Sequence, residues 1–457
     1  MPLPTPSMPD PSPSAPQNAE PRPRTAIWHK GTAAADWVTR FTVGEDWRWD
    51  TILLPYDLEG TRGHAWGLGQ IGVLTDGEVE EIGRALDALR AEWEAGALTV
   101  GPEDEDMHTV IERELTARLG AAGKKVHAGR SRNDQVLVAL RLWLRDALAA
   151  IGLEAASLAG ALADHAEQHD GLVMPGYTHL QRAMPTTAGL WAAGYADLLT
   201  DDLVGLSEAR ARADVSPWGS AAGYGVPSLD LPRGAVAERL GFGAVQENVT
   251  AVQLSRGKAE GAVVHALVQL GLTANRLASD LVLFATAEFG FVALPVEYTT
   301  GSSIMPQKRN PDVLELARAT VHRLTAELHL LLTLPANLPG GYHRDLQLTK
   351  EATMRAVLAA QDLMAALTAV LPGVTWRPDA MRAALSPDLF ATAEALRRVE
   401  AGTPFREAYR AVGTDLDALA VPPGGEALGA YATPGTPGRV DAAALRARIG
   451  AARSRFE

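Results

Sequence analysis

Two long stretches without proline constrain the fold more than any other feature of this sequence. The first runs from Glu103 to Met174 and the second from Arg233 to Leu294. Because proline ends or kinks a helix, helices can continue here well beyond the usual length of about 12 residues. Residues 135–169 of the first stretch are dense in Leu and Ala, which predicts one long helix.

The second stretch carries an apolar stripe. Apolar residues recur every three to four positions, as on the buried face of a helix, at Leu267, Leu270, Ala274, Leu277, Leu281 and Phe284. Further long helices are expected at 311–334 and 350–371, and no β-alternation of comparable length is present. The chain is therefore predicted to be mainly α, and helices this long favour an elongated bundle that associates with copies of itself.

Composition divides the chain into segments. The first 25 residues contain nine prolines, and a segment of that composition cannot form a packed core. Between the tail and the first bundle helix, short helical patterns alternate with turns, and Thr75 is a plausible N-cap. We expect a disordered Pro-rich tail at 1–25, an N-terminal helical domain at 26–111, a central long-helix bundle domain at 112–373 and a small C-terminal helical domain at 374–457.

The C-terminal segment is richer in Gly and Pro than the bundle. Residues 389–399 and 404–412 predict helices, and 422–439 predicts a loop.

Charge and cysteine content exclude several functions. The net charge of -13 disfavours general binding to nucleic acid or to anionic membranes. The absence of cysteine excludes disulfides and thiolate catalysis and fits a cytoplasmic protein. No stretch offers 18 uninterrupted apolar residues, so we expect a soluble protein. His165 and His169 could share a helix face, but no third ligand is suggested, and no metal site is expected.

The segment GSSIMPQKRNPD, residues 301–312, interrupts the helical background. Two serines, a lysine, an arginine and an asparagine stand beside two prolines, which predicts an ordered loop that enters a helix. Hydroxyls, backbone N–H groups and cations gathered in one loop suit a reaction in which a proton leaves carbon and negative charge gathers on a carboxylate. The alternative interpretation is a polar surface turn.

Three other segments could carry chemistry. Residues 126–135 place Arg132 and Asn133 near a helix N-terminus, which favours anions. Residues 174–182 present Thr178 and His179 after a Pro-Gly turn, and histidine is the usual proton carrier near neutral pH.

Residues 341–350 cluster Tyr342, Gln347 and Lys350, which suits carboxylate binding. We call the segment 301–312 the GSS loop. Glu315 lies one turn inside the helix that follows this loop and could raise the basicity of an imidazole. Each of these candidates also has a purely structural interpretation: the polar segments could be solvated loops, His179 a structural histidine, and Glu315 an ordinary acid in the first turn of its helix.

Other common sites are not indicated. We find no P-loop and no GxGxxG between a strand and a helix, so use of ATP or a dinucleotide is unsupported. Ser302 and Ser303 lack the GxSxG context of hydrolases.

Together the four segments resemble the fumarase/aspartase superfamily and, within it, the argininosuccinate lyase family. MPQK followed by a basic residue and Asn-Pro-Asp, at 305–312, is that family's form of the superfamily loop. The likeness extends from about Trp28 to Val412.

The resemblance implies a three-domain lyase fold whose central bundle assembles into a homotetramer, with each active site shared by three subunits. It implies cofactor-free, reversible cleavage of argininosuccinate into arginine and fumarate, the last step of arginine biosynthesis.

The resemblance also implies roles. Ser302 would be the base and His179, paired with Glu315, the acid, although the sequence leaves open which of the two does which. Lys308 and Asn310 would stabilise the dianionic intermediate. The carboxylates and amino group of the substrate would be held by Arg132, Asn133, Thr178, Tyr342, Gln347 and Lys350.

One segment departs from the family pattern. Phe41-Thr-Val-Gly-Glu stands where the family has an FNAS-like segment that supplies a substrate-binding serine, and whether Thr42 replaces it is open. Two alternatives follow: a superfamily lyase acting on a different N-substituted aspartate, and a non-catalytic structural relative.

Overall fold

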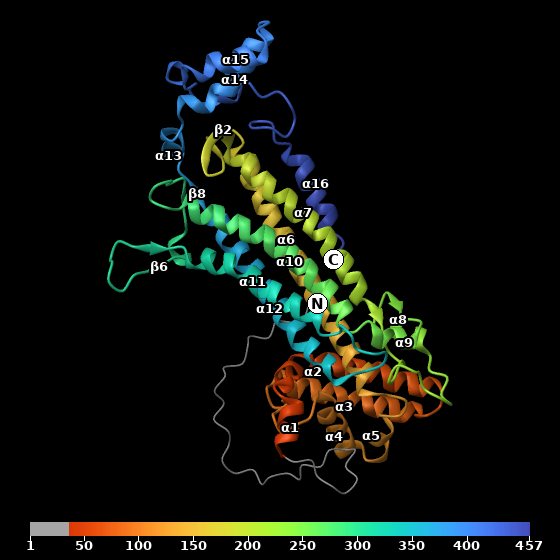
Figure 1. Cartoon of the computed structure of the whole chain (residues 1–457). Helices are drawn as coiled ribbons and strands as arrows, with labels where there is room; N and C mark the ends of the chain where they lie inside the picture. Colours follow the sequence, from red (N-terminus) through yellow and green to blue (C-terminus); the bar gives the residue numbers. More distant parts are fainter. Residues whose placement is uncertain (1–35) are drawn as a thin grey trace. The chain divides into compact units, whose positions relative to one another are not determined.

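The computed structural model describes residues 36–457, and most of these residues are helical (Figure 1). The expected tail at 1–25 lies outside the described residues. The described chain forms two compact units: unit 1 holds residues 36–147, 210–263 and 329–355, and unit 2 holds 148–209, 264–328 and 356–457. The division into three domains that the sequence suggests stays a prediction.

Unit 1 is built from helices of moderate length and one two-residue parallel β-pair. Thr75 caps α3 as predicted, since its Oγ1 accepts from the backbone N–H of Glu78 and the Glu78 carboxylate accepts from the N–H of Thr75. The elements are α1 (Asp36–Val43), α2 (Asp46–Gln70), α3 (Asp76–Glu94), α4 (Met107–Leu119), α5 (Ala121–Lys125), β3 (Val215–Ser216), α8 (Arg233–Arg239), β4 (Ala244–Val245), α9 (Val249–Leu254) and the 3-10 turn η2 (Arg344–Gln347).

Helix α2 corrects the expectation of short helices in this region. It runs for 25 residues and passes through Pro55 without ending. Its glycines, which weaken an isolated helix, allow α8 to pack closely: a Cβ at Gly67 would lie 2.8 Å from Val236, and one at Gly63 would lie 2.8 Å from Leu240. Tertiary packing overrides local propensity here.

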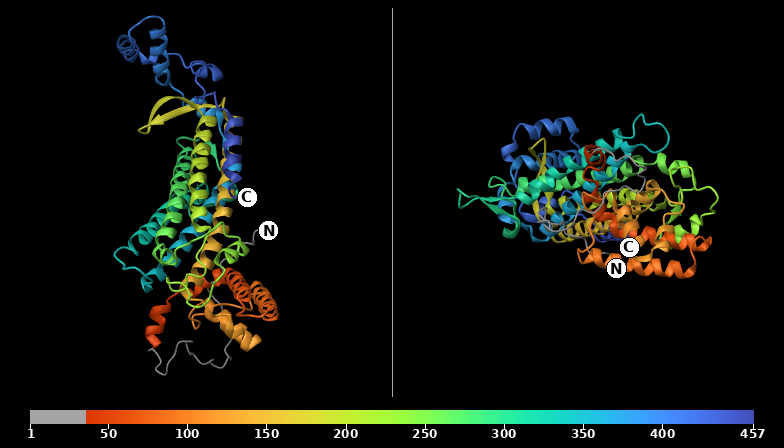
Figure 2. Two further views of the ribbon diagram at one scale, coloured as in Figure 1. Left: turned by 90° about the vertical axis from the view of Figure 1, so that its right-hand side faces the viewer. Right: turned by 90° about the horizontal axis from the view of Figure 1, so that it is seen from below.

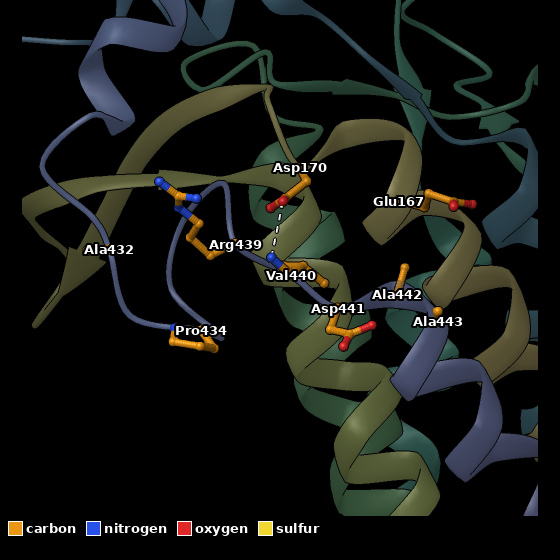
Figure 3. Close-up of a pocket in the computed structure, with 9 residues that line it drawn as sticks. All are labelled: Glu167, Asp170, Ala432, Pro434, Arg439, Val440, Asp441, Ala442 and Ala443. Carbon is orange, nitrogen blue, oxygen red and sulfur yellow. Dashed lines mark hydrogen bonds between the residues drawn. The ribbon is translucent and has the colours of Figure 1, made fainter.

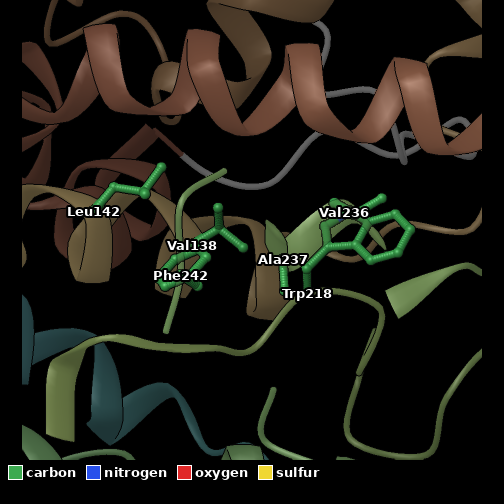
Figure 4. Close-up of a cluster of buried hydrophobic side chains, with 6 residues drawn as sticks. All are labelled: Val138, Leu142, Trp218, Val236, Ala237 and Phe242. Carbon is green, nitrogen blue, oxygen red and sulfur yellow. The ribbon is translucent and has the colours of Figure 1, made fainter. Parts of the chain in front are cut away.

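A buried cluster joins the long helix α6 (Arg132–His169) to the segment around α8 (Figure 4). Its members are at most 7% exposed and are Val138, Leu142, Trp218, Val236, Ala237 and Phe242. This cluster fixes the start of α6, which carries part of the candidate site.

His64 is locked in its neutral form beside this cluster. Trp218 Nε1 donates to His64 Nδ1 at 3.1 Å, and His64 Nε2 lies 3.0 Å from the carbonyl oxygen of Ala128. Complete burial, reinforced by the nearby Arg130 charge, holds the pKa of His64 well below its usual value.

Five long helices run through both units. They are α6 (Arg132–His169), α7 (Ala188–Ala213), α10 (Lys258–Phe284), α11 (Asp312–Thr333) and α12 (Leu348–Val370). The sequence predicts four of them, and α7 was not predicted. All six residues of the predicted stripe on α10 are buried, none more than 6% exposed. Within unit 2 these helices lie side by side (Figure 2), which confirms a mainly helical fold with a long central helix.

Short elements complete unit 2. The predicted helices at 389–399 and 404–412 appear as α14 and α15, and the segment 422–439 contains only a short 3-10 turn. The elements are β1 (Val173–Thr178) with β2 (Gln181–Thr187), β5 (Val292–Ala293) with β8 (Thr375–Trp376), β6 (Thr300–Gly301) with β7 (Arg309–Asn310), α13 (Pro378–Ala383), α14 (Ala391–Glu400), α15 (Phe405–Gly413) and α16 (Ala442–Arg453).

Helix α16 was not predicted, and it packs on α6. Arg446 Nη2 contacts the carboxylates of Asp164 and Glu167 at 2.8 and 2.6 Å. Beyond the helix, Phe456 covers Gly152 so closely that a Cβ there would lie 2.4 Å from the aromatic ring.

Among the residues that the structure describes, one segment, Arg344–Gly373, is long and apolar enough to cross a membrane by length and composition. Half of its most apolar part is buried inside the protein, so its apolar residues are partly used in packing.

His64 makes the stability of the protein sensitive to acid. The unfolded chain binds a proton on this histidine near pH 6.5, whereas the folded chain resists it until a lower pH, so the free energy of unfolding falls as pH drops through this window. We expect His64→Gln to remove up to about 1.4 kcal/mol per pH unit of this dependence, measured by urea unfolding at pH 7, 6 and 5. The exposed His322 offers a matched control, and His322→Gln should leave the dependence unchanged.

Candidate active site

The loop before α6 is fixed by the carboxylate of Asp134. Its Oδ1 accepts from the N–H of Ser131 at 3.1 Å, and its Oδ2 accepts from the N–H groups of Gly219 and Ala221 at 3.2 and 3.0 Å. Burial raises the pKa of Asp134, and these bonds and the Arg130 charge oppose the rise. Asp134 therefore ties the end of this loop to residues 219–221, and Asn133 lies beside it in the first turn of α6.

Arg132, predicted to hold a substrate carboxylate, is already engaged by acidic side chains. Its Nη1 lies 2.9 Å from Glu105, its Nε lies 3.1 Å from Asp106, and its Nη2 donates to Thr109 Oγ1 at 2.9 Å. These contacts orient the guanidinium before any ligand binds. Burial raises the pKa of Glu105, and Arg132 offsets this only in part.

Lys350 is buried between two carboxylates. Its Nζ lies 2.5 Å from Asp50 Oδ1 and 2.8 Å from Asp46 Oδ2. Burial by itself lowers the pKa of Lys350, but the two carboxylates outweigh burial and raise it above the usual value. Lys350 is thus a fixed positive charge.

The other two predicted residues of this segment, Gln347 and Tyr342, contact neighbouring parts of unit 1. Gln347 Nε2 donates to the carbonyl oxygen of Thr42 at 3.1 Å, which places α1 beside η2. The guanidinium of Arg256 lies 4.9 Å from the centre of the Tyr342 ring, a cation–π contact that fixes the ring. Five predicted binding residues therefore belong to unit 1: Arg132, Asn133, Tyr342, Gln347 and Lys350.

His179 stands at the exposed tip of the β1–β2 hairpin in unit 2. The pair Thr178–Gln181 closes a two-residue turn in which His179 and Leu180 both have positive φ, 55° and 58°. Such turns usually contain Asn or Gly, and a side chain in this conformation costs roughly 1–3 kcal/mol. Local strain of this kind clusters at functional sites.

The GSS loop holds Ser302 against two backbone donors. Ser302 Oγ accepts from the N–H groups of Met305 and Ile304 at 3.1 and 3.3 Å. The β6–β7 pair, which the sequence did not indicate, closes the loop, and Asn310 Nδ2 donates to the carbonyl oxygen of Gly301 at 3.4 Å. Lys308 is exposed on the same loop.

The chain does not bring its predicted acid and base together within unit 2. Among residues 36–457, no hydrogen bond or ion pair joins His179 to Glu315 or to Ser302. The two hairpins leave the bundle at different places in both views (Figures 1 and 2). The roles of His179, Ser302 and Glu315 stay predictions.

Sequence reasoning missed the carboxylates that hold the cations of unit 1. Asp46 and Asp50 are four residues apart and so share one face of α2, a spacing that was visible in the sequence. That Lys350, 300 residues away from Asp50, meets this face could not be read from spacing.

A separate cavity of about 490 Å³ lies in unit 2 beside the start of α16 (Figure 3). It is lined by Glu167, Asp170, Ala432, Pro434, Arg439, Val440, Asp441, Ala442 and Ala443. No predicted site residue lines it, so we do not assign it to the active site.

No metal centre is found in the described part of the chain, where no three His, Asp or Glu side chains group as ligands. His165 Nδ1 instead accepts from Trp376 Nε1 at 3.3 Å, a structural role.

The sequence matches a family model described as "Lyase" over residues 45–325. An argininosuccinate lyase of Sorangium cellulosum (strain So ce56) is 46% identical over 414 residues, 91% of this chain and 96% of the relative. One of Xanthomonas euvesicatoria pv. vesicatoria (strain 85-10) is 45% identical over 389 residues, 84% of this chain and 89% of the relative.

Solved structures share the fold. A crystal structure of EDDS lyase in complex with formate has a TM-score of 0.74 and 23% identity, covering 93% of this chain and 91% of the other. A class II fumarase from Schistosoma mansoni has a TM-score of 0.67 and 15% identity, covering 83% and 91%.

These likenesses, with the helical bundle and the GSS loop, define a lyase of the fumarase superfamily. Within that class the chain belongs to the argininosuccinate lyase family.

The two lysines of the candidate site differ in burial, so their replacement should affect stability differently. Lys350→Met leaves Asp50 buried without its cation, and we expect the free energy of unfolding to fall by roughly 3–5 kcal/mol. Lys308→Met, at an exposed position, should change it by less than about 0.5 kcal/mol. Urea unfolding of both variants checks this, and equal stabilities would show that the buried ion pairs contribute little.

Proposed function

We propose that the protein is a carbon–nitrogen lyase that cleaves argininosuccinate reversibly into arginine and fumarate. A proton leaves the succinyl carbon, the bond between the neighbouring carbon and the guanidino nitrogen breaks, and that nitrogen is protonated. The elimination involves no net oxidation or reduction. An acid, a base and fixed charge are therefore sufficient, and no cofactor is proposed.

Ser302 is proposed as the base. A serine acts as a base only when its alkoxide is stabilised, and the two N–H groups on Ser302 Oγ provide such stabilisation. Lys308, on the same loop, supplies positive charge for the dianionic intermediate, and Asn310 supplies an amide donor. His179, paired with Glu315, is proposed as the acid that protonates the leaving nitrogen.

Residues of unit 1 are proposed to bind the rest of the substrate. Arg132 and Lys350 are cations held in place by acidic neighbours, so they offer fixed charge to carboxylates. Asn133, Tyr342 and Gln347 add hydrogen-bond donors, and Thr178 from the β1–β2 hairpin is proposed to complete the set.

We propose that separate copies of the chain complete each site. The predicted residues fall on separate places: unit 1, the tip of the β1–β2 hairpin, the GSS loop and, for Glu315, the first turn of α11. The long helices also leave large apolar side chains exposed, which favours self-association. They are Leu198 at 45%, Leu272 at 45%, Leu316 at 70% and Leu332 at 62%. A homotetramer in the cytoplasm is the assembly and compartment we propose.

The observation that carries the proposed reaction is 46% identity over 91% of the chain to an argininosuccinate lyase. This sequence also contains every residue to which the resemblance assigns a chemical role. Absorbance of fumarate released from argininosuccinate tests it. Ser302→Ala and His179→Asn should each lower kcat by at least about 100-fold, the usual contribution of a positioned acid or base, and leave the assembly intact. Near-full activity of either variant would show that its assigned role is wrong.

A second lyase reaction is kept as an alternative because of the unusual segment at 41–45. No fumarate from argininosuccinate, together with fumarate from another N-substituted aspartate, would favour it. A non-catalytic relative would release fumarate from neither.

Sharing of sites between copies predicts complementation. When Ser302→Ala and Asn133→Ala chains are unfolded, mixed equally and refolded, some sites receive both intact residues from different copies. We expect roughly a quarter of the wild-type activity from random assembly of a symmetric oligomer. Activity no higher than that of the separate variants would contradict shared sites. Each variant refolded alone serves as the control.

A further inference from the structure

The two carboxylates on Lys350 are not equivalent. Asp50 is 1% exposed, and its second oxygen accepts from the N–H of Met107 at 3.0 Å, so both of its oxygens are used. Asp46 is 15% exposed, and only its Oδ2 has a partner, the Nζ of Lys350. Within residues 36–457, no hydrogen bond is found for Asp46 Oδ1.

Among the groups in direct contact with Lys350, negative charge exceeds positive charge. One ammonium faces two carboxylates, and Asp50 alone is sufficient to neutralise it. Burial raises the pKa of Asp46, Lys350 offsets the rise in part, and the nearby charge of Asp50 adds to it.

Arg344 and Arg256 also act on Asp46 from a distance, and Arg344 lowers its pKa. Within residues 36–457 neither forms an ion pair with Asp46: Arg344 donates to the Thr42 carbonyl oxygen at 2.9 Å, and Arg256 lies over the Tyr342 ring. A second cation beside Asp46 would therefore be stabilised.

Asp46 lies among residues proposed to hold the substrate. It contacts Lys350 directly, and four residues earlier in the chain the carbonyl oxygen of Thr42 accepts from Gln347. A ligand that reaches Lys350 and Gln347 therefore comes to this carboxylate.

We propose that Asp46 binds the primary ammonium group of the substrate and so selects for ligands with an amino-acid end. The inference rests on the proposed function, since argininosuccinate carries one primary ammonium, remote from the bond that breaks. A hydrogen bond between an ammonium and a carboxylate is among the stronger kinds in proteins. Lys350 holds Asp46 in position and retains a free donor, because only two of its three N–H groups are used.

Two ligands that differ only in this group test the proposal. L-Arginine and 5-guanidinopentanoate share the guanidinium, the chain and the carboxylate, and only L-arginine has the ammonium. We would measure their binding by calorimetry to the wild-type protein, to Asp46→Asn and to Glu45→Gln. Glu45 is an exposed neighbour paired with Arg48 at 2.9 Å, so Glu45→Gln changes the charge equally away from Lys350.

The wild-type protein should prefer L-arginine by about 10- to 100-fold, the usual effect of a hydrogen bond to a charged group. Asp46→Asn should reduce the preference to about twofold or less through weaker binding of L-arginine, and Glu45→Gln should retain it. A preference that persists in Asp46→Asn overturns the proposal. Tighter binding of both ligands by Asp46→Asn also overturns it, because it would show that ligand carboxylates displace Asp46 from Lys350.

A parallel fumarate assay distinguishes this inference from the proposed function. Turnover of argininosuccinate without an Asp46-dependent preference removes the inference and leaves the function. An Asp46-dependent preference for L-arginine without turnover of argininosuccinate removes the proposed function and leaves the inference that Asp46 binds an ammonium group. Circular dichroism checks folding, and Asp46→Ser replaces Asp46→Asn if the latter does not fold.

Discussion

The contact on which unit 1 most depends is the ammonium of Lys350 with its two aspartates. A buried charge is tolerated only when it is paired, so Lys350 must be paired with Asp50 in the folded protein. The pair joins the start of α2 to the start of α12 across 300 residues of sequence. The same contact fixes a positive charge where a carboxylate-binding group is expected, so stability and binding depend on one side chain.

Much of the helical architecture could be predicted because it depends on local patterns. The stripe from Leu267 to Phe284 is buried as expected, and the cap at Thr75 forms as its neighbours suggest. Helix α2 was misjudged because its glycines and Pro55 weaken an isolated helix, whereas here the glycines admit α8. Helix α16 was missed although its own residues favour a helix, because it follows a segment rich in Gly and Pro that was read as a loop.

The candidate site could be predicted by residue type but not by partner. Segments with hydroxyls, amides and cations stand out against Leu- and Ala-rich helices, which is why Ser302, His179 and Lys350 could be chosen. Their partners come from distant positions: Arg132 meets Glu105 and Lys350 meets Asp46 only after folding. The strain at His179 likewise depends on backbone torsion, which residue types alone do not specify.

Preorganisation links these features. The amides on Ser302 Oγ are in place without substrate, and the strained turn holds His179 at an exposed tip. The described chain thus presents its candidate reactive groups at separate places, and we propose that the assembly of copies brings them together. A division of this kind makes the association of subunits part of the catalytic apparatus.

The contact between Gly152 and Phe456 has a consequence for how such a chain can diverge. The α-carbon of Gly152 lies under the aromatic ring with no room for one more methyl group. A larger residue at 152 can be accepted only together with a smaller one at 456. We therefore expect these two positions, 304 residues apart, to covary among descendants of this sequence, whereas neighbouring outward-facing positions on the same helix drift independently.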